Sequence, residues 1–319
     1  MRYRCTHCNH WFHINRAKRS PLDTQLTLAH LDGASFRSLA DRFGVNHTTI
    51  YRKVTRYLES LPHCADVSRQ YCSKYSGILE VDGKFVKVKG YERKIPVIYG
   101  IDYQTHDIPT YRLAQSEGYQ ACLKYFSSLK LLNYPLMSLV ADDNPNIKMA
   151  GEFVYPKLVF QLCQRHFKQG VKLTLNLTEN PHYQSFFSQV IELFASKRAP
   201  DDFNRCAKNI FNQCKTDPTL LAIILDIHQR QVDLLGWRGV KNTPVTTNLI
   251  ECFNSHLQGR LKTIKGFESF KHANLWLNGY FIRRRTRKFT DCQGKFSRLN
   301  GKTSLSQTKK PGIDLPNFF

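Results

Sequence analysis

The stretch GILEVDGKFVKV, residues 77–88, decides the fold class of this chain. It is an apolar run followed by Asp82-Gly83 and then by apolar residues that alternate with lysines. Strand-forming residues on both sides of an Asp-Gly pair predict a β-hairpin with its turn at Asp82-Gly83. Working outward, KIPVIYGIDY (94–103) and IPTYRLAQ (108–115) predict two more strands. Three antiparallel strands therefore open a sheet.

Helices and strands alternate after these three strands. We predict a helix over 118–132, a buried strand LMSLVA (136–141), a helix near 145–153 and a strand KLVFQL (157–162). This order is typical of an α/β fold with a mixed sheet and helices on its faces. Residues 167–244 have helical spacing throughout and predict an all-helical insertion. Two further helices follow Pro244, and the tail after Lys288 is expected to be loosely ordered.

Residues 20–61 predict three short helices that begin at Ser20-Pro21. The small Ala40, Gly44 in a left-handed turn, and apolar residues at 45 and 50 suit two helices that cross at a tight turn. This indicates a helix-turn-helix, and the alternative is an ordinary helical hairpin with a solvated basic side. The outward face that would enter a major groove consists of Asn46, His47, Thr48, Thr49, Tyr51, Arg52 and Lys53.

The composition favours a nucleic-acid partner. The 319 residues include 47 Lys+Arg against 25 Asp+Glu, for a formal charge of +22, and 41% are hydrophobic. Such a charge asks for a polyanion, and this apolar content suffices for two or more folded domains. No apolar run approaches the roughly 20 residues needed to span a membrane. We expect no membrane association, ten reduced cysteines, and a cytoplasmic protein on the DNA of a prokaryotic nucleoid.

Three acidic residues stand where catalytic groups are found in α/β folds. Asp82 follows the strand GILEV, Asp142 follows LMSLVA, and Glu251 lies in the first turn of a late helix. Functional groups of open sheets gather at strand ends. Carboxylate oxygens bind Mg²⁺ or Mn²⁺, and two such ions activate an attacking hydroxyl and stabilise the leaving oxygen of a phosphodiester. We predict that these three residues form one metal site with a catalytic role.

Each carboxylate also has a simpler structural explanation. Asp82 with Gly83 can be a plain hairpin turn, and Asp142 or Asp143 can cap the helix near 145–153. Glu251 lies three residues after Asn248, as in a capping box. The order of the three along the chain carries more weight than any one of them.

That order resembles a known family. The set LEVDGKF (79–85), SLVADD (138–143), FQLCQRHF (160–167) and TTNLIECFNSHLQGRLK (246–262) is similar to the mutator-like (MULE) transposase superfamily and its bacterial insertion-sequence relatives, over residues 77–285. The resemblance implies a ribonuclease H-like core with a helical insertion before the catalytic Glu. It also implies recognition of terminal inverted repeats and cut-and-paste or copy-out transposition. By position, the metal-binding DDE triad is Asp82, Asp142 and Glu251.

Two pairs of closely spaced residues, one Cys-His and one Cys-Cys, are candidates for further roles. Cys163 and His166 accompany the active site in the resembling family, so we class them, with Asn248, as supporting residues; a buried structural pair is the alternative. Cys5 and Cys8 have the spacing of a zinc-ribbon knuckle. In related transposases a second ligand pair precedes this one. Here either that half is missing or the site is completed by His7, His10, His13 or Cys64.

The sequence therefore predicts a DDE transposase, a Mg²⁺- or Mn²⁺-dependent enzyme that acts on double-stranded DNA at element ends and target. We expect a homo-oligomer on DNA and no small-molecule substrate. The alternatives are a helix-turn-helix regulator, a nuclease or integrase with the same core, and an inactive or domesticated derivative. The expected parts are a partial zinc ribbon (1–18), a helix-turn-helix domain (19–62), a catalytic core (75–166 and 245–288), the insertion (167–244) and the tail (289–319).

Overall fold

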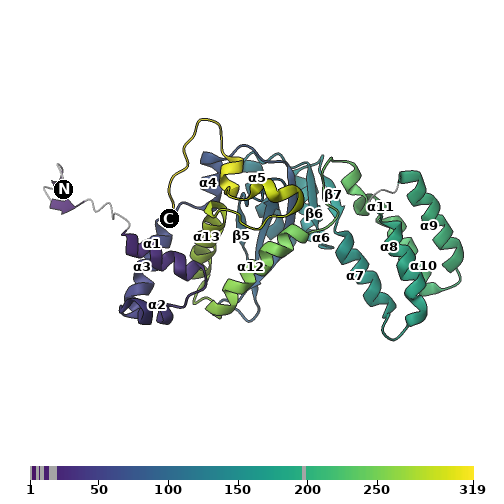
Figure 1. Ribbon diagram of the computed structural model, residues 1–319, viewed down its shortest axis with the longest axis horizontal. Coiled ribbons are helices and arrows are strands. Elements are labelled where there is room, and N and C mark those ends of the chain that lie inside the picture. Colours follow the sequence, from purple (N-terminus) through teal and green to yellow (C-terminus); the bar gives the residue numbers. More distant parts are fainter. Residues whose placement is uncertain (1, 5–6, 8–10, 14–19, 196–198) are drawn as a thin grey trace.

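The computed structural model describes residues 2–4, 7, 11–13, 20–195 and 199–319. Its elongated shape has helices near the N-terminus at one end, a sheet with covering helices in the middle, and further helices at the other end (Figure 1). None of the described helices has the length and apolar character needed to cross a membrane. The described strands are β1 (Arg2–Arg4), β2 (Trp11–His13), β3 (Ile78–Val86), β4 (Ile95–Asp102), β5 (Tyr111–Leu113), β6 (Ser138–Ala141) and β7 (Val159–Leu162).

The central sheet has the order β5-β4-β3-β6-β7. Strands β3, β4 and β5 are antiparallel, whereas β6 and β7 run parallel to β3. The mixed α/β architecture predicted from the sequence is confirmed. Because β3, β6 and β7 share one direction, the residues that follow β6 and β7 lie at the same edge of the sheet.

The predicted turn at Asp82-Gly83 is wrong. Strand β3 continues through both residues, with Asp82 paired to Tyr99 and Gly83 to Ile98, and the chain reverses only between Val86 and Ile95. Gly83 serves a different purpose, because a Cβ atom there would lie 1.9 Å from Oε1 of Glu117. The missing side chain leaves room for a carboxylate against the strand.

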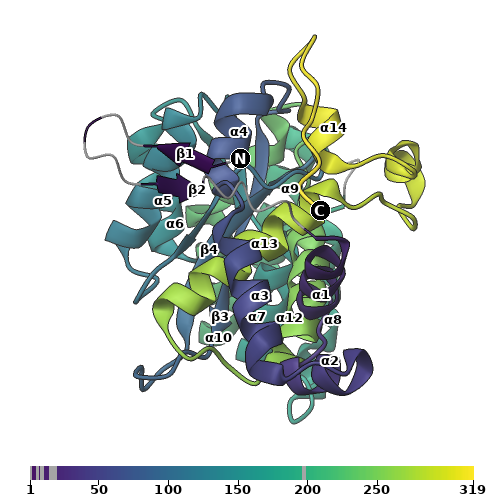
Figure 2. The same ribbon diagram turned by 90° about the vertical axis from the view of Figure 1, so that its left-hand side faces the viewer.

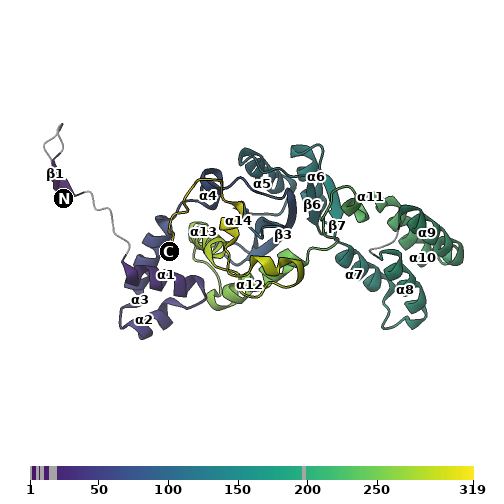
Figure 3. The ribbon, with the colours of Figure 1, turned by 45° about the horizontal axis from the view of Figure 1, so that its top comes forward.

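Two clusters of apolar side chains cover the two faces of the sheet. Leu79 and Val81 of β3 belong to the cluster that includes α5 and α6, while Val97 and Tyr99 of β4 face α12, α13 and the N-terminal helices. Side chains alternate along a strand, so Glu80 and Asp82 point towards α12. Figure 3 shows α12 beside β3.

The helices of the N-terminal part and the core agree closely with the predicted ranges. They are α1 (Pro21–Leu31), α2 (Phe36–Phe43), α3 (His47–Glu59), α5 (Tyr119–Leu131), α6 (Pro145–Val154), α12 (Asn248–Ile264) and α13 (Phe270–Thr286). A further helix, α4 (Cys64–Tyr71), lies in a stretch for which the sequence predicted no helix. Gly44 ends α2 in the left-handed conformation, with φ of 62°, and Ile50 is buried. The turn between α2 and α3 thus has the geometry expected from the sequence.

Between residues 164 and 238 the described chain consists of helices and short connections, without a strand. The helices are α7 (Gln164–Leu175), η1 (Pro181–Tyr183), α8 (Gln184–Leu193), α9 (Pro200–Cys214), α10 (Pro218–Gln229), α11 (Gln231–Leu234) and η2 (Gly236–Arg238). They extend from the β7 edge of the sheet (Figure 1). Helix α7 begins directly after β7, so it connects this helical region to the edge of the sheet where β6 and β7 end.

The prediction of a loosely ordered tail is wrong. Residues 289–319 contain η3 (Gly294–Leu299) and α14 (Ser304–Thr308), and Leu299, Leu305 and Phe318 are buried. Two hydroxyls of α14, from Ser304 and Thr308, donate to the buried carboxylate of Asp107. The tail is held by these apolar contacts and hydrogen bonds to the core.

Candidate active site

Asp82 lies on β3, and Asp142 directly follows β6, the parallel strand next to it. The register pairs Glu80 with Val140, so each aspartate stands two residues beyond a paired position. Adjacent strands are about 4.8 Å apart, and the negative charge of Asp142 raises the pKa of Asp82. The two carboxyl groups therefore share one region at the edge of the sheet.

Helix α12 brings Glu251 to the same region. The buried carboxylate of Glu80 accepts a hydrogen bond from the backbone N–H of Ile250, at 2.9 Å. One turn further on, the side-chain amide of Asn254 donates to Oδ2 of Asp82, at 2.6 Å. These two bonds hold the first turns of α12 against β3. Glu251 lies between them in sequence, and its charge also raises the pKa of Asp82.

The electrostatics of the site disfavour carboxylates without a cation. Burial, followed by the charge of Asp142, raises the pKa of Asp82 to about 6, although the N–H of Gly83 and the charge of His166 oppose the shift. Burial also raises the pKa of Asp142, and His166 partly offsets that effect. Desolvation and like charges are the two causes that make carboxylates hard to ionise. A bound cation would reverse both.

The helix-cap explanations do not hold for the aspartates. Asn144 is the N-cap of α6 and accepts from the N–H of Asn146. Asp143 forms an ion pair with Arg230, at 2.5 Å. By contrast, Oδ1 of Asp142 is buried and has no hydrogen-bond partner among the described residues. Asp142 is thus the acidic residue of this segment that lacks a structural role.

The capping-box explanation for Glu251 also differs from the structure. The N-cap of α12 is Thr247, and Asn248 is the first helical residue. Thr247 donates its hydroxyl to Oε1 of Glu251, at 3.0 Å. The side chain of Asn248 instead accepts from Arg165, at 3.1 Å. Glu251 therefore projects from the first turn with its carboxylate directed towards α7.

Sequence reasoning missed a fourth acidic residue, Glu117. Its carboxylate lies over Gly83, and burial followed by the charges of Asp142 and Asp82 raises its pKa to about 7. Glu117 precedes α5 in a short polar segment, SEG (116–118), without a strand end or cap to single it out. The one available signal was Gly83, an isolated glycine inside a strand, which often marks a close approach.

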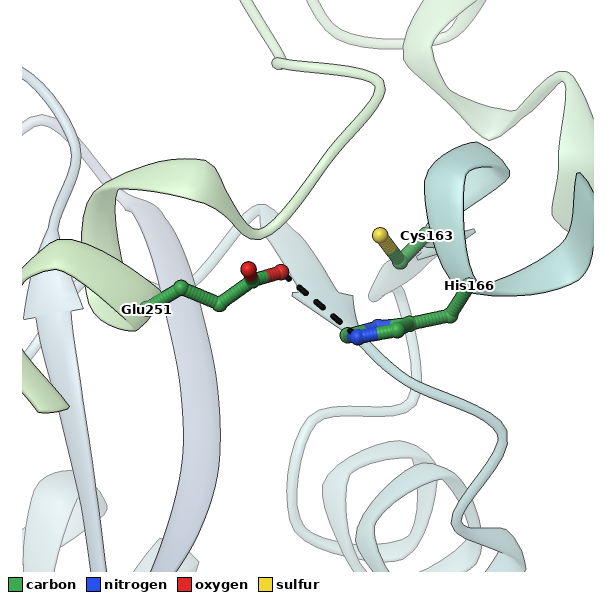
Figure 4. Close-up of side chains that lie close together, drawn as sticks. All are labelled: Cys163, His166 and Glu251. Atoms are coloured by element: carbon green, nitrogen blue, oxygen red, sulfur yellow. Dashed lines mark ion pairs between the residues drawn. The ribbon is translucent and has the colours of Figure 1, made fainter. Parts of the chain in front are cut away.

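Cys163 and His166 lie beside Glu251 (Figure 4). Potential ligand atoms of the three side chains all lie within 4.8 Å of one another. Nε2 of His166 is 3.6 Å from Oε1 of Glu251, and Oε2 of Glu251 is 2.6 Å from Arg165. Sγ of Cys163 accepts from the N–H of Thr247, at 3.4 Å, and lies 3.3 Å from the Thr247 hydroxyl. The Cys163–Thr247 contact joins β7 to the start of α12.

The donor atoms fit divalent metal ions of two kinds. Asp82, Asp142 and Glu251 supply oxygen atoms, which Mg²⁺ and Mn²⁺ prefer, and Oδ1 of Asp142 is a buried acceptor without a donor. Cys163, His166 and Glu251 offer sulfur, nitrogen and oxygen, a set that suits Zn²⁺ better. The hydrogen bond that Cys163 accepts from the N–H of Thr247 accounts for its position without a metal. Of the two sets, only the second has its ligand atoms within 4.8 Å of one another in the described parts of the chain.

The predicted DNA-contacting residues lie mainly on the exposed side of α3. Asn46 caps the helix and accepts from Thr48, and Lys53 forms an ion pair with Asp23 at 2.7 Å. Tyr51 has 40% of its surface exposed, and its ring also contacts Phe36 and a histidine of α13. The remaining exposed members of the face are His47, Thr48, Thr49 and Arg52.

The proposed zinc ligands Cys5 and Cys8, and also His10, lie outside the described residues. His7 is exposed, and His13 lies in β2. Cys64 is fully buried, and its Sγ lies 3.4 Å from Nη1 of Arg285. Cys64 thus belongs to the buried cluster around that arginine, so the zinc hypothesis stays with the N-terminal residues.

The chain matches no protein-family model and no curated protein. Among solved structures it is similar to the Drosophila P element transposase strand transfer complex, with a TM-score of 0.49 and 10% sequence identity. The alignment covers 83% of this chain and 92% of that chain. Membership of the mutator-like superfamily stays a prediction from the sequence motifs.

Proposed function

We propose that this chain is a DDE transposase that cleaves and joins DNA strands with divalent metal ions held by Asp82, Asp142 and Glu251. One observation carries the proposal most directly: Oδ1 of Asp142 is buried without a donor beside the raised-pKa carboxyl group of Asp82. A buried carboxylate oxygen without a partner is costly, and a cation next to Asp142 would balance it. The sheet order and the helices between β7 and α12 support a ribonuclease H-like core.

Each residue has a distinct part in this proposal. Asp82 and Asp142 hold the ions, and Mg²⁺ bound there supplies charge stabilisation to the phosphodiester and lowers the pKa of a bound hydroxyl. Glu251 completes the ligand set from α12. Asn254 orients Asp82 through its hydrogen bond, and the Tyr99 hydroxyl fixes Asn254 in turn, at 2.8 Å. His166 places a nitrogen donor next to Glu251.

DNA binding is the second part of the proposal. Helix α3 would enter the major groove of the terminal inverted repeats with the exposed face that begins at Asn46. A net charge of +22 provides the attraction to DNA along its backbone. Because two element ends must be brought together, we expect oligomers on DNA. The same residues would serve in both cut-and-paste and copy-out transposition.

The test uses neighbouring aspartates that differ only in their partners. Purified protein with Mg²⁺ or Mn²⁺ is assayed for nicking and joining of duplexes that carry the element ends, in wild type, Asp142→Asn and Asp143→Asn. We expect Asp142→Asn to lose about 10³-fold in rate, since a metal ion supplies several kcal/mol and about 1.4 kcal/mol is tenfold. Asp143→Asn should keep most activity, because Asp143 pairs with Arg230.

Asp82→Asn and Glu251→Gln should behave like Asp142→Asn while binding of end DNA is kept. Equal activity of Asp142→Asn and wild type would remove Asp142 from the site. Inactivity of the wild-type protein on every end duplex, with intact and specific DNA binding, would instead favour a helix-turn-helix regulator or an inactive derivative. The ion pair between Arg165 and Glu251 is the feature that favours this second function, because it occupies one expected ligand.

A further inference from the structure

A basic hollow lies where α12, α13 and the end of α1 meet. It has a volume of about 130 Å³, and we call it the junction pocket. Figure 2 shows α1, α12 and α13 close together, and the backbone of Gly33 approaches Thr263 of α12 so closely that a Cβ there would be 3.1 Å from its hydroxyl. The basic residues of the junction pocket are His256, Arg260, Arg283, Arg284, Arg287 and Lys288.

The positive charge of the junction pocket is only partly balanced. Asp32 and Asp291 also line it, but Arg283 and Arg287 approach Asp32 only to 3.7 and 4.0 Å. The Nε atoms of Arg283 and Arg284 are buried and have no hydrogen-bond partner within the described parts of the chain. Five cationic side chains thus share the junction pocket with two carboxylates, so positive charge is in excess there.

Arg284 is the residue most in need of an anion. Its guanidinium lies 4.2 Å from the ring centre of Phe253, which desolvates one face of it. Burial is the largest cause that lowers its pKa, yet an arginine stays charged in proteins. Arg284 is only partly buried, and the charge of Asp291 acts on it. Its buried Nε still has no acceptor among the described residues, and an anion in the junction pocket would supply one.

We propose that the junction pocket binds a phosphate group of the DNA backbone, an inference that rests on the proposed function. A guanidinium presents paired N–H donors that match phosphate oxygens. A hollow of about 130 Å³ is well above the volume that a single water needs, which leaves room for one phosphate group. The junction pocket lies between the N-terminal helices and α12, so DNA bound by α3 passes close to it on the way to the catalytic edge.

The experiment measures binding of a 30-base-pair duplex against salt concentration for full-length wild type, Arg284→Gln, Arg287→Gln and a control, Arg205→Gln. Arg205 is an exposed arginine of α9, far from the junction pocket, and its loss changes the net charge equally. Loss of one charged hydrogen-bond partner should weaken binding about tenfold. It should also lower the slope of log K against log salt by about 1. Arg284→Lys, which keeps the charge, should retain the wild-type slope.

Neutral methylphosphonate linkages, placed one at a time along the duplex, locate the bound phosphate. At one position the neutral linkage should weaken DNA binding by wild type and leave DNA binding by Arg284→Gln unchanged. Identical salt slopes for Arg284→Gln, Arg287→Gln and Arg205→Gln would overturn the proposal. A second combination of results would also overturn it. In that case inorganic phosphate raises the melting temperature of wild type but not of Arg284→Gln, while duplex binding is the same in both proteins. If a junction-pocket variant binds DNA as wild type does and still cleaves it with a metal ion, phosphate binding in the pocket is refuted. The proposed transposase function would stand.

Discussion

Asp107 and Asp142 both lie close to the central sheet, but only Asp107 is surrounded by donors. Its two oxygens accept from Nε and Nη2 of Arg285, at 2.9 and 2.8 Å, and from the hydroxyls of Ser304 and Thr308, both at 2.9 Å. Asp142 has a buried oxygen without a donor, and the acidic groups near it repel one another. The first arrangement serves the folded state alone, whereas the second gains from an added cation.

Removal of the Asp107 carboxylate should give the largest change in stability. Asp107→Ala leaves the fully buried guanidinium of Arg285 without its ion-pair partner, which typically costs about 3–5 kcal/mol. We expect the free energy of unfolding, measured with urea, to fall by that amount. Asp142→Ala serves as the matched control and should leave stability unchanged or raise it, because it removes a repelling charge. A similar loss in both variants would end the distinction between the two clusters.

The cluster of donors around Asp107 could not be predicted from the sequence, for a physical reason. Asp107, Arg285 and Thr308 are far apart in the chain and come together only through tertiary packing. The tail carries few periodic apolar residues, so its local pattern gave no sign that Leu299 and Leu305 would be buried. By contrast, β4, β6 and β7 are continuous apolar runs between turn signals, which periodicity detects well.

The proposed active site was predictable in part. The position of Asp142 after an apolar strand, and of Glu251 in a first helical turn, are local features, and the structure has both. The Asp82-Gly83 pair misled us, because a turn dipeptide and a strand glycine look alike in sequence. Only the position of Glu117 over Gly83 separates the two. Contacts between distant residues thus limited the prediction.

Divalent ions should stabilise the protein in a pH-dependent way. The folded state raises the pKa of Asp82 from 3.8 to about 6, so between these values the folded protein binds more protons than the unfolded chain. The contribution of protonated Asp82 to the stability of the folded state is therefore present below pH 4 and is lost as the pH rises to about 6. At pH 7.5, Mg²⁺ at about one hundred times its Kd should restore about 2.7 kcal/mol.

The measurement compares melting temperatures of wild type and Asp82→Asn from pH 4 to 8, with Mg²⁺ and with a chelator. The difference between the two proteins isolates Asp82 from other groups that titrate in this range. We expect the chelated wild type to lose stability relative to Asp82→Asn as the pH rises, and Mg²⁺ to reverse that loss. A wild type that gains stability relative to the variant over this range would show that Asp82 already has a cationic partner in the chain.

Glu80 should affect metal binding although it is not a proposed ligand. It is 1% exposed and holds the start of α12 through the N–H of Ile250. Residues that orient metal ligands typically change affinity by about 10–100-fold when mutated. We expect Glu80→Ala to weaken Mn²⁺ binding, measured by calorimetric titration, by about that factor. Glu80→Gln keeps an acceptor oxygen and should recover most of the affinity.

The matched control for Glu80 is Glu59→Ala, an exposed acidic residue of α3 paired with Lys271. It should leave Mn²⁺ affinity unchanged. Equal Mn²⁺ affinity in wild type and a folded Glu80→Ala protein would mean that α12 needs no anchor on β3. In that case the apolar contacts of Leu257 and its neighbours would be sufficient to place Glu251.

Arg165 should give the smallest effect. Its side chain is 53% exposed, and it pairs with Glu251 at 2.6 Å. An exposed ion pair contributes at most about 1 kcal/mol, so Arg165→Gln should raise Mn²⁺ affinity by no more than about fivefold. Arg230→Gln, which frees Asp143 in place of Glu251, should leave the affinity unchanged. A strong increase in Arg165→Gln would show that the arginine blocks the site, whereas a decrease would show that it orients Glu251 for the metal.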